Sequence, residues 1–244
     1  MWNGGRRRDR PEEEWDMPEN VNEATHHHTR DNSSLTASVE KRILVWLAQR
    51  MPSRVNSDHL TALGLVAMFL AGLSFWAAQW TPYALFAVVV CLGLNWLGDS
   101  LDGTLARVRD RQRPRYGFYV DHVVDVFGAA FLVMGLALSP YMSLIVGLGL
   151  LLVYLMLSAE IYLATHTVGI FRISYWKFGG TELRILLAAG TIYALYHPQV
   201  SLAGRSYLLF DVAGVIAIAS LAVTLIVSVI RNTRTLYLAE PLTK

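Results

Sequence analysis

The chain has a single cysteine, Cys91, and few charged residues. One cysteine cannot form an intrachain disulfide, and it cannot build a cysteine-based metal site or a redox pair. We therefore expect Cys91 to be an inert thiol in the core. Charged residues make up only 16% of the 244 residues, whereas 54% are hydrophobic. This balance leaves two classes, a large soluble domain or a compact membrane protein.

Charge is also scarce within a series of apolar runs. Each run has about the length that a helix needs to cross a bilayer, roughly 17 to 25 residues. We predict six spans, at residues 60–80, 82–107, 117–139, 141–165, 182–196 and 207–230. The sequence therefore predicts an all-α, multi-pass integral membrane protein whose six transmembrane helices form one bundle, in the cytoplasmic membrane if the source is bacterial.

Apolar residues are nearly missing from residues 1–34, which also lack the apolar core of a secretory signal. This composition predicts a disordered polar tail. Residues 35–51 alternate apolar and charged side chains at helical spacing, which predicts an amphipathic helix on the membrane surface. Packing of that helix against its own protein is compatible with the same pattern. Residues 52–244 are then the membrane domain.

Basic residues are almost absent from one set of loops. Of 21 Lys and Arg residues, only Arg205 lies in segments 79–82, 139–141 and 197–206, which leaves twenty in the opposite set. Because basic segments stay on the cytoplasmic side, both termini are predicted to be cytoplasmic. The loop at 107–115 is then cytoplasmic too.

Four acids flank that loop in two pairs, Asp99 with Asp102 and Asp121 with Asp125. Residues three or four apart lie on one face of a helix, so each pair points from one face. An unpaired carboxylate inside the membrane costs roughly 2.5–3.5 kcal/mol, and divalent cations would remove most of this penalty. Oxygen ligands without cysteine favour magnesium, manganese or calcium over zinc. We leave His122 out of the ligand set, because it points about 100° away from Asp121.

Small residues accompany the acids. Gly103 and Ala106 lie in the same sector of one predicted helix as the first pair, and Gly117 lies one turn before Asp121. Glycine inside a helix costs about 1 kcal/mol relative to alanine, so a ligand is expected to approach the backbone closely at Gly103. A flat group such as a nucleobase fits that description.

The pattern D-x-x-D-G-x-x-A-R, nine residues, then G-x-x-x-D-x-x-x-D resembles the signature of the CDP-alcohol phosphotransferases, also called CDP-alcohol phosphatidyltransferases. All eight fixed positions are present, which makes the match specific: Asp99, Asp102, Gly103, Ala106, Arg107, Gly117, Asp121 and Asp125. The resemblance extends from about residue 52 to 231. Asn56 and Thr61 resemble an Asn and Thr element before the first helix of that family, although Val55 stands where a proline is common.

The resemblance implies transfer of a substituted phosphate from a CDP-linked donor to a lipid or polar alcohol, with release of CMP, in phospholipid biosynthesis. It implies that Asp99, Asp102 and Asp121 hold divalent metal, most simply two magnesium ions with manganese as an alternative. Asp125 would take the proton of the attacking hydroxyl and also touch the second metal. The nucleotide would contact the positions Gly103, Ala106, Arg107, Gly117 and Asn56. A homodimer is implied as well, and no nucleic-acid partner is expected.

Between the fourth and fifth predicted spans, four charged residues lie on the side of the aspartates: Arg172, Lys177, Glu182 and Arg184. The segment G-T-E-L-R resembles a Thr-Glu pattern of choline and ethanolamine phosphotransferases, whose acceptor is diacylglycerol. A basic cluster is also what an acceptor phosphate requires. We predict that these four residues bind the acceptor. Glu160 is a further candidate lining residue, whereas Asp211 is expected to have an interfacial or structural role.

Two other functions use intramembrane acids. An intramembrane prenyltransferase also places aspartates and magnesium on a diphosphate, but its aspartate motifs lie farther apart in sequence. A divalent-cation transporter needs no chemistry, but it does not explain the small residues at Gly103, Ala106 and Gly117. The phosphotransferase is therefore the leading hypothesis.

Overall fold

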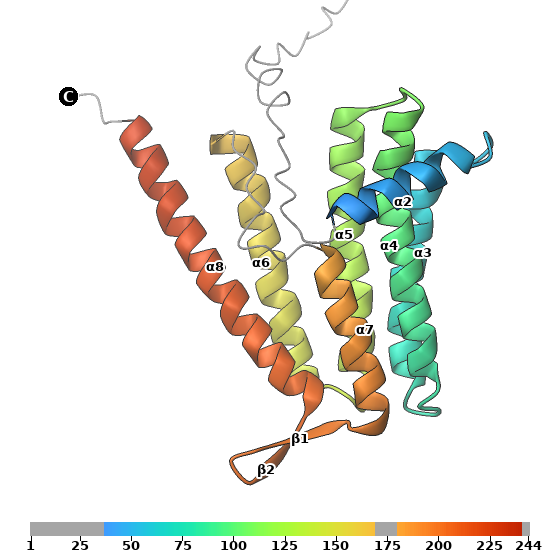
Figure 1. Cartoon of the computed structure of the whole chain (residues 1–244). Helices are drawn as coiled ribbons and strands as arrows, with labels where there is room; N and C mark the ends of the chain where they lie inside the picture. Colours follow the sequence, from blue (N-terminus) through green and yellow to red (C-terminus); the bar gives the residue numbers. More distant parts are fainter. Residues whose placement is uncertain (1–36, 169–179, 241–244) are drawn as a thin grey trace, which may run out of the picture. The chain divides into compact units, whose positions relative to one another are not determined.

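The computed structural model describes residues 37–168 and 180–240 (Figure 1). The predicted tail at 1–34 lies outside the described residues, and so do two of the predicted acceptor residues, Arg172 and Lys177.

Seven helices make up most of the described chain: α2 (Ala37–Arg50), α3 (Ser57–Ala77), α4 (Ala84–Val108), α5 (Pro114–Ala137), α6 (Leu144–Val168), α7 (Gly180–Tyr196) and α8 (Leu209–Ala239). The helices from α3 to α8 match the six predicted spans in order. Five of them, all except α7, are long and apolar enough to cross a membrane. Helix α7 has 17 residues and is the shortest of the six. The prediction of a helical, multi-pass membrane protein is confirmed.

Two helix ends differ from the predictions for identifiable reasons. Helix α5 begins at Pro114 rather than at Gly117, because proline is favoured in the first turn, where its missing N–H is not needed. Helix α8 continues to Ala239, well past the end of its apolar run at Ile230. Hydrophobicity marks the part of a helix that crosses the bilayer, whereas the polar continuation contains no proline or glycine to stop it.

A short hairpin joins α7 to α8 where the sequence analysis predicted a loop. Strands β1 (Gln199–Leu202) and β2 (Arg205–Leu208) pair antiparallel, with Leu202 opposite Arg205. The two residues of the turn, Ala203 and Gly204, have φ values of 50° and 77°. Two successive positive φ angles match the twist of a two-residue hairpin, and glycine adopts such angles without steric cost.

Helix α3 packs against both α4 and α5 by close backbone contact. A Cβ at Gly135 of α5 would lie 2.0 Å from the carbonyl oxygen of Gly72, and one at Gly72 would lie 2.2 Å from that of Phe131. On the other side, a Cβ at Gly98 of α4 would lie 2.6 Å from the oxygen of Leu60. Glycine at these crossings lets the backbones of neighbouring helices touch, as is usual in membrane bundles. The two helices that carry the aspartates are thus held through α3.

Helix α2 packs on α4 through its apolar face. Leu44 and Ala48 are buried with Leu60 of α3 and with Leu101 and Leu105 of α4. A second, larger cluster contains Cys91, which is buried as predicted. Packing against the protein is therefore a real property of α2, while its contact with a membrane surface stays a prediction.

The connection between α2 and α3 is fixed by one arginine. Arg109, at the end of α4, donates hydrogen bonds to the backbone oxygens of Met51 and Pro52, each 2.9 Å long, and to that of Val55. These three carbonyls belong to the turn between the two helices, where the Pro52 oxygen also accepts a hydrogen bond of 3.0 Å from the backbone N–H of Val55. The contact holds the start of α3, with Asn56 at its N-cap, next to the end of α4 that carries the aspartates.

Candidate active site

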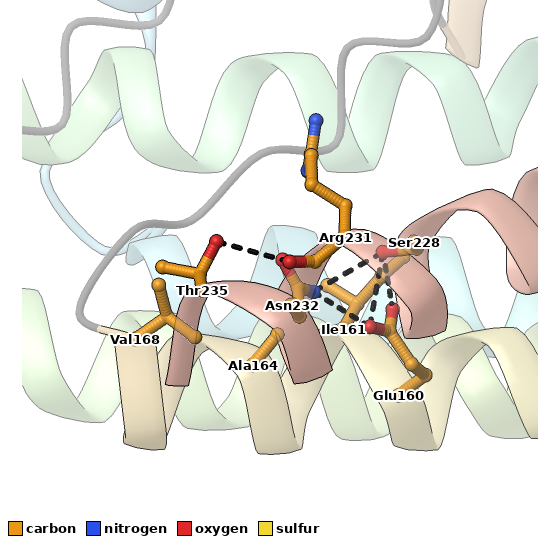
Figure 2. A pocket seen from close by; sticks show the side chains of 8 residues that line it. All are labelled: Glu160, Ile161, Ala164, Val168, Ser228, Arg231, Asn232 and Thr235. Carbon is orange, nitrogen blue, oxygen red and sulfur yellow. Dashed lines mark hydrogen bonds between the residues drawn. The ribbon is translucent and has the colours of Figure 1, made fainter. Parts of the chain in front are cut away.

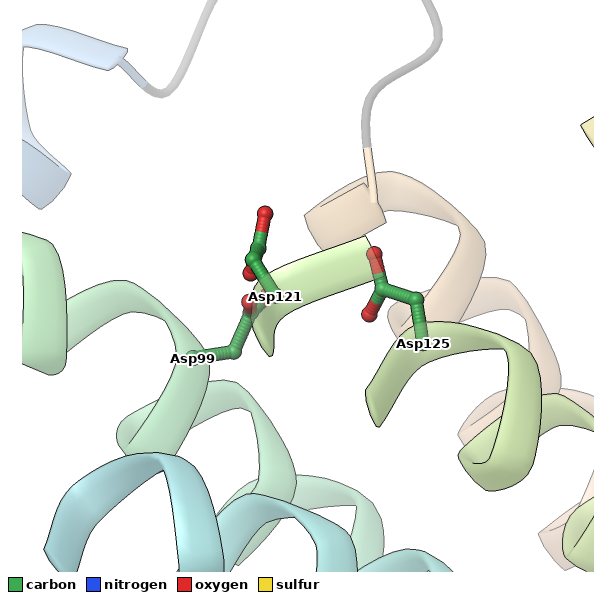
Figure 3. A group of neighbouring side chains, drawn as sticks. All are labelled: Asp99, Asp121 and Asp125. Carbon is green, nitrogen blue, oxygen red and sulfur yellow. The ribbon is translucent and has the colours of Figure 1, made fainter. Parts of the chain in front are cut away.

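Three of the four predicted aspartates converge (Figure 3). Asp99 comes from α4, and Asp121 and Asp125 come from successive turns of α5. One carboxylate oxygen from each lies within 4.8 Å of the other two. Asp99 and Asp121 are half-buried and Asp125 is exposed, so the cluster opens at its Asp125 side.

The geometry and chemistry of this cluster fit a divalent cation. Oxygens on opposite sides of Mg²⁺ lie about 4 Å apart and those around Ca²⁺ about 5 Å, so small side-chain rotations bring all three oxygens onto one ion. The donor set contains only carboxylate oxygens, which suits hard cations such as magnesium, manganese or calcium.

Asp102 lies beside the cluster and has partners of its own. Its Oδ2 accepts a hydrogen bond of 2.6 Å from the Thr61 hydroxyl, and its Oδ1 accepts one from the backbone N–H of Gly103. The Ser57 hydroxyl donates to the backbone oxygen of the same residue at 2.6 Å. The charges of Asp99 and Asp121 interact with that of Asp102. The start of α3, including the Thr61 singled out from the sequence, thus orients this aspartate.

Arg184 of α7, predicted to bind the acceptor, contacts the acidic cluster directly. Its Nη2 donates to Oδ2 of Asp99 at 2.7 Å, and its Nε donates to Oδ1 of Asn95 at 2.7 Å. Asn95 is buried and donates in turn to the backbone oxygen of Gly64. The sequence analysis did not single out Asn95. Its position one helical turn before Asp99, in an otherwise apolar run, was the available signal.

Two of the predicted nucleotide positions, Gly103 and Gly117, have few or no neighbouring atoms. A Cβ at Gly117 would meet no atom within 4 Å, and one at Gly103 would meet only the Arg107 guanidinium, at 3.6 Å. Neither glycine is therefore required by contacts within the described protein. Ala106 is half-buried, and Arg107 is exposed and donates to the Thr104 hydroxyl at 3.1 Å.

Two further contacts lie at the starts of α3 and α5. Asn56 is exposed at the start of α3, where its backbone N–H donates to Nδ1 of His59. Arg113, just before α5, forms an ion pair of 2.6 Å with Asp58, and the hydrogen bond to this carboxylate raises the pKa of Arg113. Both side chains are about half exposed, so the pair is worth little in stability.

His122 packs against α6, while its Nδ1 also lies 3.9 Å from Oδ2 of Asp121, so its exclusion from the ligand set stays a prediction. Its Nδ1 is 2.6 Å from the backbone oxygen of Phe118, and its ring packs edge-on against that of Tyr162. The Tyr162 hydroxyl donates to the backbone oxygen of His122 at 3.3 Å. This face of α6 therefore packs against α5 beside the site.

Glu160 lies on another face of α6, toward α8 (Figure 2). Its carboxylate accepts hydrogen bonds from the Ser228 hydroxyl, 2.9 Å to each oxygen, and from Asn232 Nδ2 at 2.7 Å. These residues border a cavity of about 150 Å³, which Arg231 and Thr235 also line. The neutral donors Ser228 and Asn232 satisfy this carboxylate within the bundle. Asp211 accepts a hydrogen bond from the backbone N–H of Ser143 just before α6, which is the structural role expected of it.

Glu40 of α2 is a further residue that the sequence analysis did not identify as part of the site. Its Oε1 accepts hydrogen bonds from α4 and from the start of α7. The signal was weak, because an acidic residue on an amphipathic helix is ordinarily solvated.

The comparisons with known proteins identify the family and the fold. The family model for CDP-alcohol phosphatidyltransferases matches residues 56–230. A search of curated protein sequences finds no significant match. Among solved structures, the chain resembles the phosphatidylinositol phosphate synthase of Mycobacterium tuberculosis with CDP-DAG bound, with a TM-score of 0.55 and 19% identity over 82% of this chain and 94% of that one. At this identity the likeness concerns the fold. Because the family model spans most of the chain and every motif aspartate, the protein belongs to the CDP-alcohol phosphatidyltransferase family.

Proposed function

We propose that the protein transfers a substituted phosphate from a CDP-linked donor to an alcohol acceptor and releases CMP, in a metal-dependent reaction of phospholipid synthesis. The observation that carries the proposal is the convergence of Asp99, Asp121 and Asp125 within 4.8 Å. Two glycines lie beside these acids in sequence: a Cβ at Gly117 would meet no atom within 4 Å, and one at Gly103 would meet only the Arg107 side chain. Family membership favours this function over a prenyltransferase or a cation transporter.

The carboxylates of Asp99, Asp121 and Asp125 would hold a divalent cation, and Asp102 would contribute to a second one. A carboxylate has about four lone-pair sites, so the hydrogen bonds from Thr61 and Gly103 leave Asp102 with capacity for a cation. Such cations neutralise the charge of the pyrophosphate and of the CMP leaving group. Magnesium is the first candidate and manganese the second.

Asp125 is proposed as the general base. It is the exposed member of the cluster, so an alcohol can approach it from the open side. Asp125 takes the hydroxyl proton as the acceptor oxygen bonds to phosphorus, and the bond from phosphorus to the CMP oxygen breaks. The cytidine would lie along α4 at Gly103 and Ala106, with Gly117, Arg107 and Asn56 around it.

The acceptor is proposed to enter beside α7. Glu182 is half-buried in the first turn of that helix, close in sequence to Arg184, which already reaches the cluster. Arg172 and Lys177 precede the helix in sequence and carry the positive charge that an acceptor phosphate would need. The uneven distribution of basic residues supports a cytoplasmic site and cytoplasmic termini. A homodimer is proposed from the family resemblance alone.

The test is CMP release by purified protein supplied with CDP-diacylglycerol or CDP-ethanolamine, magnesium and a panel of alcohols. We expect CMP with at least one pair of substrates, and none after chelation of divalent ions. Asp125→Asn should lose turnover by a factor on the order of 100 or more while it retains nucleotide binding, because it keeps one oxygen but cannot accept the proton.

The matched control is Asp110→Asn, which removes an exposed acid from the loop between α4 and α5. Asp110 has a φ of 51°, a conformation that asparagine tolerates well, so this variant should retain activity. Absence of CMP with every donor would refute the proposed reaction, and full activity of Asp125→Asn would refute its role as base.

A further inference from the structure

A single carboxylate oxygen connects three helices next to the acidic cluster. Oε1 of Glu40 on α2 accepts hydrogen bonds from Trp96 Nε1 at 3.1 Å, from Ser100 Oγ at 3.5 Å and from Thr181 Oγ1 at 3.2 Å. Two of these donors belong to α4, and the third lies in the first turn of α7. Glu40 is half-buried, and its carboxylate is directed at neutral donors of the bundle.

An ordinary interfacial helix does not require such a contact. The apolar residues Leu44 and Ala48 already attach α2 to α4, one and two turns after Glu40. Drawing a carboxylate out of water costs free energy unless hydrogen bonds replace its hydration, and here the three donors replace it. The hydrogen bonds to Glu40 therefore need a particular arrangement of the three helices. Through them α2 contacts the start of α7 as well as α4.

The three partners of Glu40 lie within one turn of residues that reach the acidic cluster. Ser100 follows Asp99 in α4, and Trp96 follows Asn95. Thr181 is three residues before Arg184, so the two lie one turn apart in α7. Arg184 donates to both Asn95 and Asp99, each at 2.7 Å. One end of α7 is thus fixed to α4 twice, through Glu40 and through Arg184.

We propose that Glu40 is a positioning residue, which fixes the first turn of α7 and thereby holds Arg184 against the metal ligand Asp99. The inference deepens the proposed function and rests on it for the role of Asp99. It makes α2 a part of the active-site scaffold, in addition to any role at the membrane surface.

Four variants test the proposal. Glu40→Ala removes the acceptor, Glu40→Gln retains an acceptor oxygen, and Thr181→Val removes only the donor on α7. The control is Gln49→Ala, which removes an exposed side chain of similar size from the same helix. The first measurement is hydrogen exchange of the backbone amides of residues 181–187, and the second is Mn²⁺ affinity of the purified protein. The kcat and the acceptor KM are then measured with the substrates that release CMP.

Glu40→Ala and Thr181→Val should both accelerate exchange in the first turns of α7 by about 10-fold. Both should weaken Mn²⁺ binding or lower kcat on the order of 10-fold, as loss of an outer-shell partner of a ligand commonly does. Glu40→Gln should restore most of each value, and Gln49→Ala should match the wild type. A fifth variant combines Glu40→Ala with Thr181→Val, and it should exchange little faster than Thr181→Val alone, since both substitutions remove the same hydrogen bond.

Wild-type exchange and Mn²⁺ affinity in Glu40→Ala would overturn the proposal. Equal defects in Glu40→Gln and Glu40→Ala would overturn the hydrogen-bonding role. If Glu40→Ala does not fold, Thr181→Val decides the question, because it leaves the contacts with α4 in place. Hydrogen exchange and Mn²⁺ titration need no turnover, so the positioning role of Glu40 is tested even if no donor yields CMP.

Discussion

Glycine serves two different purposes along α4. Gly98 packs directly against the backbone of α3, so a methyl group there would clash with the backbone of Leu60 and Gly64. Gly103, little more than a turn later and next to Asp102, has only the Arg107 guanidinium near its Cβ position, at 3.6 Å. The first position brings α4 against α3, and the second is where the proposed nucleotide would approach the helix.

Gly103→Leu should reduce the affinity for the CDP-linked donor on the order of 100-fold while the protein stays folded. The leucine side chain would meet only the end of the exposed, flexible Arg107 side chain, which can move aside, but it would occupy the space proposed for cytidine. Nucleotide binding to purified protein measures this, and thermal denaturation reports folding. Gly93→Leu is the matched control, because Gly93 lies on the same helix with no atom within 4 Å of its Cβ position and is exposed away from the site. Equal donor affinity in the two variants would contradict the cytidine placement.

Arg184 has two candidate roles, binding the acceptor and orienting Asp99. Arg184→Gln should lower kcat by about 10- to 100-fold and change the magnesium concentration required, because Asp99 loses its cationic partner. The acceptor KM should change little if orientation of Asp99 is the main role. A rise in acceptor KM with unchanged kcat and metal dependence would instead assign Arg184 to the acceptor.

At the scale of helices, α3 is the element on which the site depends. It contacts α4 through Gly98 and α5 through Gly72 and Gly135, so it fixes the separation of the two aspartate-bearing helices. It also supplies Ser57 and Thr61 to Asp102. The helix contributes no aspartate to the three-acid cluster, yet it sets the geometry of that cluster.

Gly135→Ala should destabilise the protein by about 1–3 kcal/mol, because the new methyl group would lie 2.0 Å from the oxygen of Gly72 and must push α3 and α5 apart. Gly128→Ala is the control on the same helix, where the methyl group meets only the flexible Met68 side chain at 3.2 Å. Alanine favours a helix over glycine by about 1 kcal/mol, which offsets the shift of a few tenths of an ångström that Met68 must make, so the control should cost much less than Gly135→Ala. Thermal denaturation in detergent distinguishes them, and equal effects would argue against a tight α3–α5 contact.

At the scale of the whole molecule, the distribution of positive charge predicts orientation. The hairpin β1–β2 carries one basic residue, Arg205, whereas the loop between α4 and α5 carries several. In a Cys91→Ala background, a cysteine replacing Ser201 should react with a membrane-impermeant maleimide on intact cells, and one replacing Gln112 should react only after permeabilisation. Both positions are exposed, so the reverse pattern would invert the proposed topology.

The sequence by itself determined the class of the protein, the order of its helices and the identity of the acids. Apolar length and the near absence of charge are local properties, and each predicted span has a counterpart among α3–α8. The spacing of Asp99, Asp102, Asp121 and Asp125 is local as well, since helical periodicity alone places each pair on one face. The family resemblance rested on the same residues, and the family model confirms it.

Only the tertiary structure decided which side chains meet. It grouped Asp99 with Asp121 and Asp125, directed Asp102 to Thr61, and brought Arg184 and Glu40 to α4 from distant parts of the chain. Residues 40 and 181 are 141 positions apart, and no periodicity within one helix encodes a contact between two. The physical reason is that such contacts depend on how closely helices cross, and for α4 and α5 the glycine-mediated backbone contacts with α3 set that distance.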